Sequence, residues 1–175
     1  MSPIRILDPI LISKIAAGEV IERPASVVKE LLENAIDAGS TEITITIKEG
    51  GKDLIEIRDN GKGIRSEDIA LAVKRHSTSK ISKEEDLSNI NTMGFRGEAL
   101  YSIASVSRFS ITSRTSDEEI ATKIGVMGDV DSIVVSKEVL GSPGTILRVQ
   151  DLFFNFIVRR KFLKKAHIEQ DIFTM

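Results

Sequence analysis

Residues 41–59 read TEITITIKEGGKDLIEIRD, and this stretch decides the fold class. Isoleucine alternates with polar residues in both halves of it, at Ile43, Ile45, Ile47, Ile55 and Ile57. Alternation with a period of two predicts strands that bury one face, and the Gly-Gly pair between the halves is typical of a hairpin connection. The stretch therefore predicts two antiparallel strands at the start of a sheet.

Helical patterns lie on both sides of this hairpin. Pro24 can begin a helix, because its missing N–H would be unpaired there anyway, and Gly39 can end it. Between them an apolar stripe recurs at helical spacing, at Val27, Val28, Leu31, Leu32, Ala35 and Ile36. Further helices are predicted near 66–74, 97–104 and 157–168, and further strands at 107–113, 120–126, 132–138 and 145–150.

The predicted strands follow one another in hairpin-linked runs, without regular alternation of strand and helix. This order predicts an α+β fold, a two-layer sandwich in which a mostly antiparallel mixed sheet is covered on one face by helices. The 175 residues suit one domain that is large enough to bury a core.

Composition excludes several kinds of site. The net charge of −2 provides no general basic field for nucleic acid, so any DNA contact must come from a local patch. The absence of cysteine excludes disulfides, thiolate zinc sites and a cysteine nucleophile. No apolar run approaches the roughly 20 residues of a membrane span, and no signal-peptide pattern begins the chain. We therefore expect a cytoplasmic protein without membrane contact, or a nuclear one in a eukaryote.

A polar ridge borders the apolar stripe of the first long helix. Glu30 and Asn34 are four residues apart and lie about 40° apart around a helix, with Asp37 on the same side. A carboxylate there can take a proton from water, and an amide oxygen can bind Mg²⁺. On the helix alone, a solvated polar edge is the preferred interpretation, because amphipathic helices have such edges by default.

The turn Asp59-Asn60-Gly61-Lys62-Gly63 follows the second strand of the hairpin. A buried Asp59 carboxylate can accept a hydrogen bond from an exocyclic amine, and Gly61 and Gly63 allow close backbone approach to a base or sugar. Thr145, at the start of a later strand, could contact the same base or a water held by Asp59. An ordinary Asn-Gly turn and an ordinary β-branched strand residue remain the alternatives.

Two loops carry groups suited to phosphate. Thr78, Ser79 and Lys80 offer two hydroxyls and a cation, although a solvated loop is the simpler interpretation of these three alone. Residues 94–100 read GFRGEAL, in which two glycines flank an arginine just before a helix. Such a loop can bring backbone N–H groups and one cation to an anion. Neither Gly-Lys pair has the spacing of a P-loop, and the Gly61-x-Gly63 pair lacks the third glycine of a dinucleotide fingerprint.

The order of these motifs is more specific than any one of them. It resembles the ATPase module shared by DNA gyrase B, Hsp90, histidine kinases and the MutL family of mismatch repair proteins, with its MLH and PMS relatives. The resemblance to the MutL family rests on residues 15–20, 22–31, 37–39 and 94–100, and it extends to 159–163. It implies a Bergerat-type ATP-binding fold of the GHKL superfamily, with ATP and Mg²⁺ as cofactors.

The same resemblance implies residue roles. Glu30 would activate the attacking water, Asn34 would hold Mg²⁺, and Asp59 would bind the adenine amine. Further nucleotide contacts would come from Asp37, Gly61, Gly63, Thr78, Ser79, Lys80 and Thr145, and from a lid that closes on the phosphates, with Gly94, Phe95, Arg96, Gly97, Glu98, Ala99 and Leu100.

The resemblance also implies a domain organisation. Residues 1–175 would form a single GHKL-type ATP-binding domain, without the second, transducer domain that supplies a lysine to the γ-phosphate and without the distal dimerisation domain. The expected function is ATP binding with slow hydrolysis, weak or lost in the isolated piece. In the full-length protein, nucleotide state would control homo- or heterodimerisation, contact with a MutS-like mismatch recognition protein, and weak DNA binding.

Two other functions stay open. A basic helix with Arg159, Arg160, Lys161, Lys164 and Lys165 could neutralise DNA phosphates, which would suit a DNA-binding or interaction module with a vestigial nucleotide site. Packing of that helix against another domain is the preferred interpretation, because phenylalanines surround it. A gyrase B-like or Hsp90-like ATPase is the third possibility. Family members usually carry Asn-Thr-Pro-Ala where this chain has Asn155-Phe156-Ile157-Val158, which leaves the start of the helix in doubt.

Overall fold

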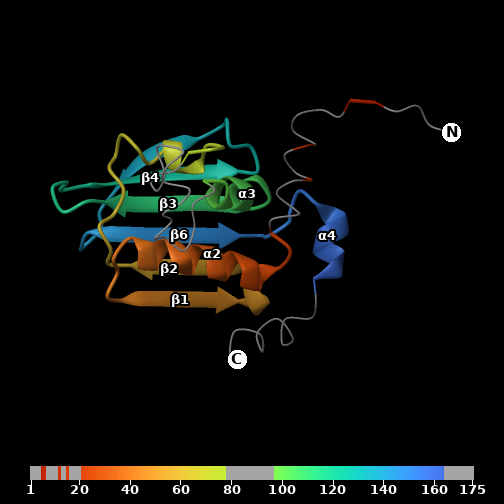
Figure 1. Cartoon of the computed structure of the whole chain (residues 1–175), viewed down its shortest axis with the longest axis horizontal. Helices are drawn as coiled ribbons and strands as arrows, with labels where there is room; N and C mark the ends of the chain where they lie inside the picture. The colour runs from red at the N-terminus through yellow and green to blue at the C-terminus, as the bar shows by residue number, and fades with distance from the viewer. Residues whose placement is uncertain (1–4, 7–11, 13–14, 16–20, 78–96, 164–175) are drawn as a thin grey trace, which may run out of the picture.

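A computed structural model describes residues 5–6, 12, 15, 21–77 and 97–163 (Figure 1). In this part of the chain a six-stranded sheet has the order β1-β2-β6-β3-β4-β5, and every ladder in it is antiparallel. The strands are β1 (Ile43–Lys48), β2 (Leu54–Asp59), β3 (Arg108–Arg114), β4 (Ala121–Met127), β5 (Val134–Glu138) and β6 (Gly144–Gln150). The α+β fold is confirmed, and the described ladders include no parallel pair, whereas a mixed sheet was expected.

Helix α2 (Pro24–Asp37) forms where the sequence predicts it. Pro24 occupies the first turn after an extended Arg23, and Gly39 follows the helix with a φ of 75° that favours glycine. Val27 and Leu31 are fully buried, and the helix packs against β2 (Figure 1). The apolar stripe thus provides the second layer that the hairpin requires.

Helix α3 (Ala99–Ser105) lies on the same side of the sheet as α2 and contacts α2, β3 and β4 (Figure 1). Between the helices and the sheet lies one apolar core, whose largest fully buried side chains include Phe153, Ile21, Leu31, Ile55 and Ile103. The opposite face of the sheet is polar, and the Glu56–Arg148 ion pair joins β2 to β6 there. The two-layer arrangement is confirmed.

Strand β6 lies between β2 and β3, although it follows them by many residues in the sequence (Figure 1). Its register places Thr145 directly opposite Asp59 of β2 and directly opposite Ser113 of β3. Directly opposed residues share a face of a sheet, and this face is the helix-covered one, since Ile57, Leu147 and Ile111 lie on it two residues away. Three buried polar side chains therefore meet in one row at one edge of the core.

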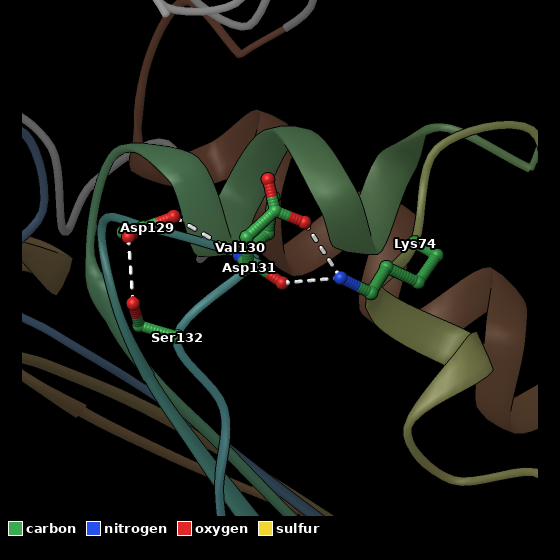
Figure 2. A network of polar contacts seen from close by, with 5 residues as sticks. All are labelled: Lys74, Asp129, Val130, Asp131 and Ser132. Carbon is green, nitrogen blue, oxygen red and sulfur yellow. Dashed lines mark hydrogen bonds and ion pairs between the residues drawn. The ribbon is translucent and has the colours of Figure 1, made fainter.

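The helix predicted over 66–74 is wrong. Turns occupy residues 66–70, and only a 3-10 helix, η2 (Leu71–Val73), follows. The Ser66 N–H donates to Glu118 Oε1 at 2.9 Å. Figure 2 shows the other end, where Lys74 Nζ donates to Val130 O at 3.0 Å and to Asp131 Oδ1 at 2.7 Å. Each end of the segment is thus tied to a different connection between strands, and these ties replace a regular helix.

Helix α4 (Ile157–Phe162) begins without the proline that is usual in the family. Its first residue follows Phe156, whose φ of −133° and ψ of 70° are not helical, and the Arg160 N–H donates to Phe156 O at 3.1 Å. The missing proline therefore does not prevent the helix from starting there. The predicted continuation to residue 168 lies outside the described residues.

Candidate functional site

Asp59 ends β2 with a buried side chain that is only 7% exposed. Its Oδ1 accepts hydrogen bonds from the Gly61 N–H at 2.8 Å and from Ser40 Oγ at 3.2 Å. Burial raises the pKa of Asp59, and hydrogen bonds from Gly61, Ser40 and the Thr145 backbone oppose that rise. The result is a desolvated carboxyl group that is held in one orientation and can accept hydrogen bonds from a ligand.

The turn after Asp59 packs tightly against the rest of the protein. A Cβ on Gly61 would lie 2.7 Å from Ser40 Oγ, and one on Gly63 would lie 2.1 Å from Arg114 O. Gly63 also has a φ of 73°, which side chains rarely adopt. The sequence suggested that these glycines allow a ligand to approach the backbone. In the structure, their missing side chains allow the residues after α2 and the end of β3 to pack against the turn.

Asn60 fixes the outer side of the same turn. Its Oδ1 accepts from the backbone N–H groups of Thr41 and Glu42, both at 2.9 Å, and its Nδ2 donates to Thr41 Oγ1 at 2.8 Å. These bonds tie the end of β2 to the residues just before β1. Asn60 is therefore an anchor of the turn, and its side chain is exposed on the surface.

Ser113 holds the inner side of the turn, and sequence reasoning missed it. Its side chain is fully buried, and its Oγ accepts from the Ile64 N–H at 2.8 Å. The same oxygen donates to Gly144 O at 2.9 Å and lies 2.9 Å from Thr145 Oγ1. A serine in a strand gives no signal of such a role by itself; only the register of β3 against β6 reveals it. Ser40, which lies between α2 and β1 and donates to Asp59, was also missed, because its partner is 19 residues away in the sequence.

The ridge on α2 begins beside this turn. The Lys62 N–H donates to Ala38 O at 3.1 Å, so the carboxyl end of α2 contacts the turn directly. Asp37, Asn34 and Glu30 follow backwards along the helix at spacings of three and four residues, and all three are half-buried. At about 1.5 Å per residue, Glu30 lies roughly 10 Å along the axis from Asp37. The ridge thus leads away from Asp59 along the helical layer.

The Gly97–Leu100 part of the predicted lid is described, and it leads into α3. Gly97 has a φ of 63°. Glu98 Oε1 lies 3.1 Å from His76 Nδ1 and 3.7 Å from Arg75 Nε. Leu100 packs against the core, next to the start of the helix. The remaining predicted contacts lie outside the described residues: Thr78, Ser79, Lys80, Gly94, Phe95 and Arg96.

Comparison with known proteins agrees with this arrangement. Residues 21–140 match the family described as histidine kinase-, DNA gyrase B- and HSP90-like ATPase. The match covers more than half of the chain, and the chain belongs to this family.

Within the family, the chain is similar to DNA mismatch repair protein MutL. It is 55% identical over 166 residues to MutL of Xanthomonas axonopodis and 54% identical over 170 residues to MutL of Heliobacterium modesticaldum. These alignments cover 95% and 97% of this chain but only 26% and 25% of the relatives, so the chain spans about a quarter of their length.

Solved structures show the same similarity. The Aquifex aeolicus MutL ATPase domain complexed with ADP is 38% identical, with a TM-score of 0.69 over 87% of this chain and 52% of that chain. A second structure, of the N-terminal domain of a DNA repair protein, is 34% identical with a TM-score of 0.70. The fold of this chain is thus that of the MutL ATPase domain.

Proposed function

We propose that this chain is the ATP-binding and slowly hydrolysing module of a MutL-like DNA mismatch repair protein. The observation that carries the proposal is the buried Asp59 carboxyl at the end of β2, opposite Thr145 and beside a turn in which Gly61 and Gly63 have no room for a Cβ. A desolvated acceptor of this kind suits the exocyclic amine of adenine. The similarity to an ADP-bound relative supports the same ligand.

Magnesium fits the donor groups of the α2 ridge. Asn34 offers a hard amide oxygen from a half-buried position, one helical turn from Asp37. Among the described residues, no three histidine or acidic side chains gather into a metal site of their own. Mg²⁺ usually binds through few protein ligands and completes its shell with substrate phosphates and water, so Asn34 would hold it together with the nucleotide. The bound ion would neutralise phosphate charge.

Glu30 is proposed to activate water for attack on the terminal phosphate. It lies one helical turn before Asn34 on the half-buried ridge, so its carboxylate would take the proton of a water if Asn34 holds the metal beside the phosphates. Gly97, Glu98, Ala99 and Leu100, with residues 78–80 and 94–96, would complete the phosphate side. The catalytic lysine would come from a second domain of the longer protein.

Calorimetry tests the base-binding end. ATP with Mg²⁺ should bind the parent chain, and Asp59→Asn should weaken binding by about 10- to 100-fold, because the charged acceptor for the exocyclic amine is lost. Asp53→Asn is the matched control, since Asp53 is exposed beside the other end of the same strand. Equal affinity of Asp59→Asn and the parent would remove Asp59 from the site.

Turnover tests the ridge. In the longer protein, Glu30→Ala should retain ATP binding and lose hydrolysis, while Glu33→Ala should retain both. Glu33 is the matched control, because it lies on the same helix and pairs with Lys29 at 3.8 Å. Unchanged hydrolysis in Glu30→Ala would contradict its role.

In the longer protein, we infer that nucleotide state controls dimerisation and contacts with DNA and a MutS-like mismatch recognition protein. The support is the name and length of the relatives, which are mismatch repair proteins about four times as long as the aligned segment. In this organisation residues 1–175 form the ATP-binding domain, followed by a transducer domain and a dimerisation domain. None of the helices in the described residues is long and apolar enough to span a bilayer. A repair role would place a bacterial protein in the cytoplasm.

The rival DNA-binding function finds less support. On α4, Arg159 Nη1 donates to Ile21 O at 3.1 Å, and Arg160 pairs with Asp151 at 3.5 Å. Two of the described cations are therefore engaged within the chain. Neutralising Arg159 and Arg160 together should change DNA affinity little at physiological salt. A steep loss of DNA affinity, with no measurable ATP binding by the parent, would favour the rival function.

A further inference from the structure

We propose that Ser113 is a positioning residue that makes the Asp59–Thr145 pair select the amine of adenine over an oxo purine. The proposal rests on the proposed ATP binding and adds a cause for base specificity. Ser113 itself lies behind Thr145, on the strand beyond β6, so it acts through its neighbour. Three observations carry the argument: its burial, its hydrogen bonds and the register of three strands.

The hydrogen bonds of Ser113 use all that a hydroxyl group offers. A serine hydroxyl has one proton and two lone pairs. The Ile64 N–H, 2.8 Å away, can only donate, and Gly144 O, 2.9 Å away, can only accept. We assign the Ser113 proton to Gly144 O, because this gives the carbonyl a donor while one lone pair of Ser113 takes the Ile64 N–H.

The remaining lone pair of Ser113 faces Thr145 Oγ1, which is 2.9 Å away. Either hydroxyl could donate in this contact by distance alone, and with the Ser113 proton on Gly144 O the donor is Thr145. The Thr145 proton then points to β3, and its oxygen has only lone pairs to present elsewhere. Ser113 thus converts a hydroxyl that could donate or accept into an acceptor.

Thr145 is directly opposite Asp59 on the helix-covered face, and the two side chains are 6% and 7% exposed. Asp59 also contributes acceptor atoms, so in this proposal the two residues offer only acceptors to the base. An exocyclic amine supplies donors to these acceptors. An oxo group at the same place would bring its lone pairs against the lone pairs of Asp59 and Thr145. In a desolvated site these acceptors would stay unpaired, and a site built to hydrogen-bond one group strongly rejects such a ligand.

Calorimetry with ATP and inosine triphosphate tests this proposal, since the second nucleotide replaces the amine with an oxo group. The parent should prefer ATP. In Ser113→Ala the Thr145 hydroxyl is released and can donate to the oxo group. The preference for ATP, which is the dissociation constant of inosine triphosphate divided by that of ATP, should therefore fall by about tenfold. In a Thr145→Val background, Ser113→Ala should leave the ratio unchanged, because the residue through which Ser113 acts is gone.

Ser107→Ala is the matched control. Ser107 is also fully buried, and its Oγ donates to Ile103 O at 2.7 Å at the end of α3. This variant should lower thermal stability without changing the nucleotide ratio. A merely structural role for Ser113 would give the same result as Ser107.

An unchanged ratio in a folded Ser113→Ala variant would overturn the proposal, and so would a change of equal size in the Thr145→Val background. If Ser113→Ala does not fold, Ser113→Cys replaces it, because a thiol is a weak donor and acceptor. The preference of this variant for ATP over inosine triphosphate should fall. An unchanged preference would overturn the proposal equally. Failure of the parent to bind ATP at all would instead contradict the proposed function.

Discussion

The two ends of the candidate site are held in different ways. At the Asp59 end, buried side chains and close backbone contacts join α2, β2, β3 and β6. At the Glu98 end, an ion pair with Arg75 and a polar contact with His76 join side chains that are 32% to 70% exposed. Buried hydrogen-bonded groups keep one geometry, whereas exposed ion pairs contribute little and exchange easily with water. The comparison indicates that the Asp59 end is rigid and that the Glu98 end can adjust; under the proposed function these are the base-binding end and the phosphate end.

The largest expected effect comes from filling the turn at the rigid end. Gly63→Ala places a Cβ 2.1 Å from Arg114 O at a φ of 73°, so it should destabilise the fold by roughly 3 kcal/mol or more. Gly125→Ala is the control, because nothing lies within 4 Å of its Cβ position. Urea unfolding measures both variants. Equal stabilities would show that the turn is not rigid.

Asn60→Ala tests the outer anchor of that end. It removes three side-chain hydrogen bonds to residues 41 and 42, and should destabilise the fold by about 1–2 kcal/mol. Thr41→Ser keeps the hydroxyl that Asn60 contacts and should stay within about 0.5 kcal/mol of the parent. A neutral Asn60→Ala in the same urea experiment would mean that water replaces these bonds at no cost.

Glu98→Gln tests the exposed end. The pairs with Arg75 and His76 are mostly solvated, so the loss should be below about 1 kcal/mol and should fade at high salt. Unfolding at low and at high ionic strength measures it. A loss as large as that of Gly63→Ala would abolish the distinction between the two ends.

The smallest expected effect is the pH dependence of the stability that Glu118 contributes, and this residue lies outside both ends of the site. Hydrogen bonds from Thr115 and Ser66 lower the pKa of Glu118 from 4.5 to about 2. A carboxylate with a lowered folded-state pKa stabilises the fold above its unfolded pKa and loses that contribution as pH falls towards the folded value. The parent should therefore be slightly more stable than Glu118→Gln at neutral pH, and the difference should disappear between about pH 4.5 and 2. Glu119→Gln, at the exposed neighbouring position, is the control; a difference that grows in acid would contradict the assignment.

Local pattern predicted the elements that form the rigid end. The alternating isoleucines of residues 43–57 and the stripe between Pro24 and Gly39 gave β1, β2 and α2 nearly at their observed bounds. These elements depend on contacts that repeat every two or every three to four residues, which a sequence displays directly. The helix over 66–74 failed because its ends bind Glu118 and Asp131, and neither partner is visible locally.

Candidate site residues could be proposed from the sequence where a motif is continuous, and they were missed where only strand pairing brings residues together. Asp59 and its glycines stand in one turn, so their chemistry was recognisable. Ser113 became visible only once β6 was placed between β2 and β3, a long-range choice that no local period encodes. The roles of Glu30 and Asn34 came from family resemblance, and they stay predictions.

The most direct measurement is a crystal structure of the chain with ATP or ADP and Mg²⁺. The account predicts density for the purine at the end of β2, with its amine within hydrogen-bonding distance of the Asp59 carboxylate and the phosphates leading along α2 towards Asn34. A purine bound elsewhere, or an Asp59 carboxylate that contacts no part of the nucleotide, would contradict the account.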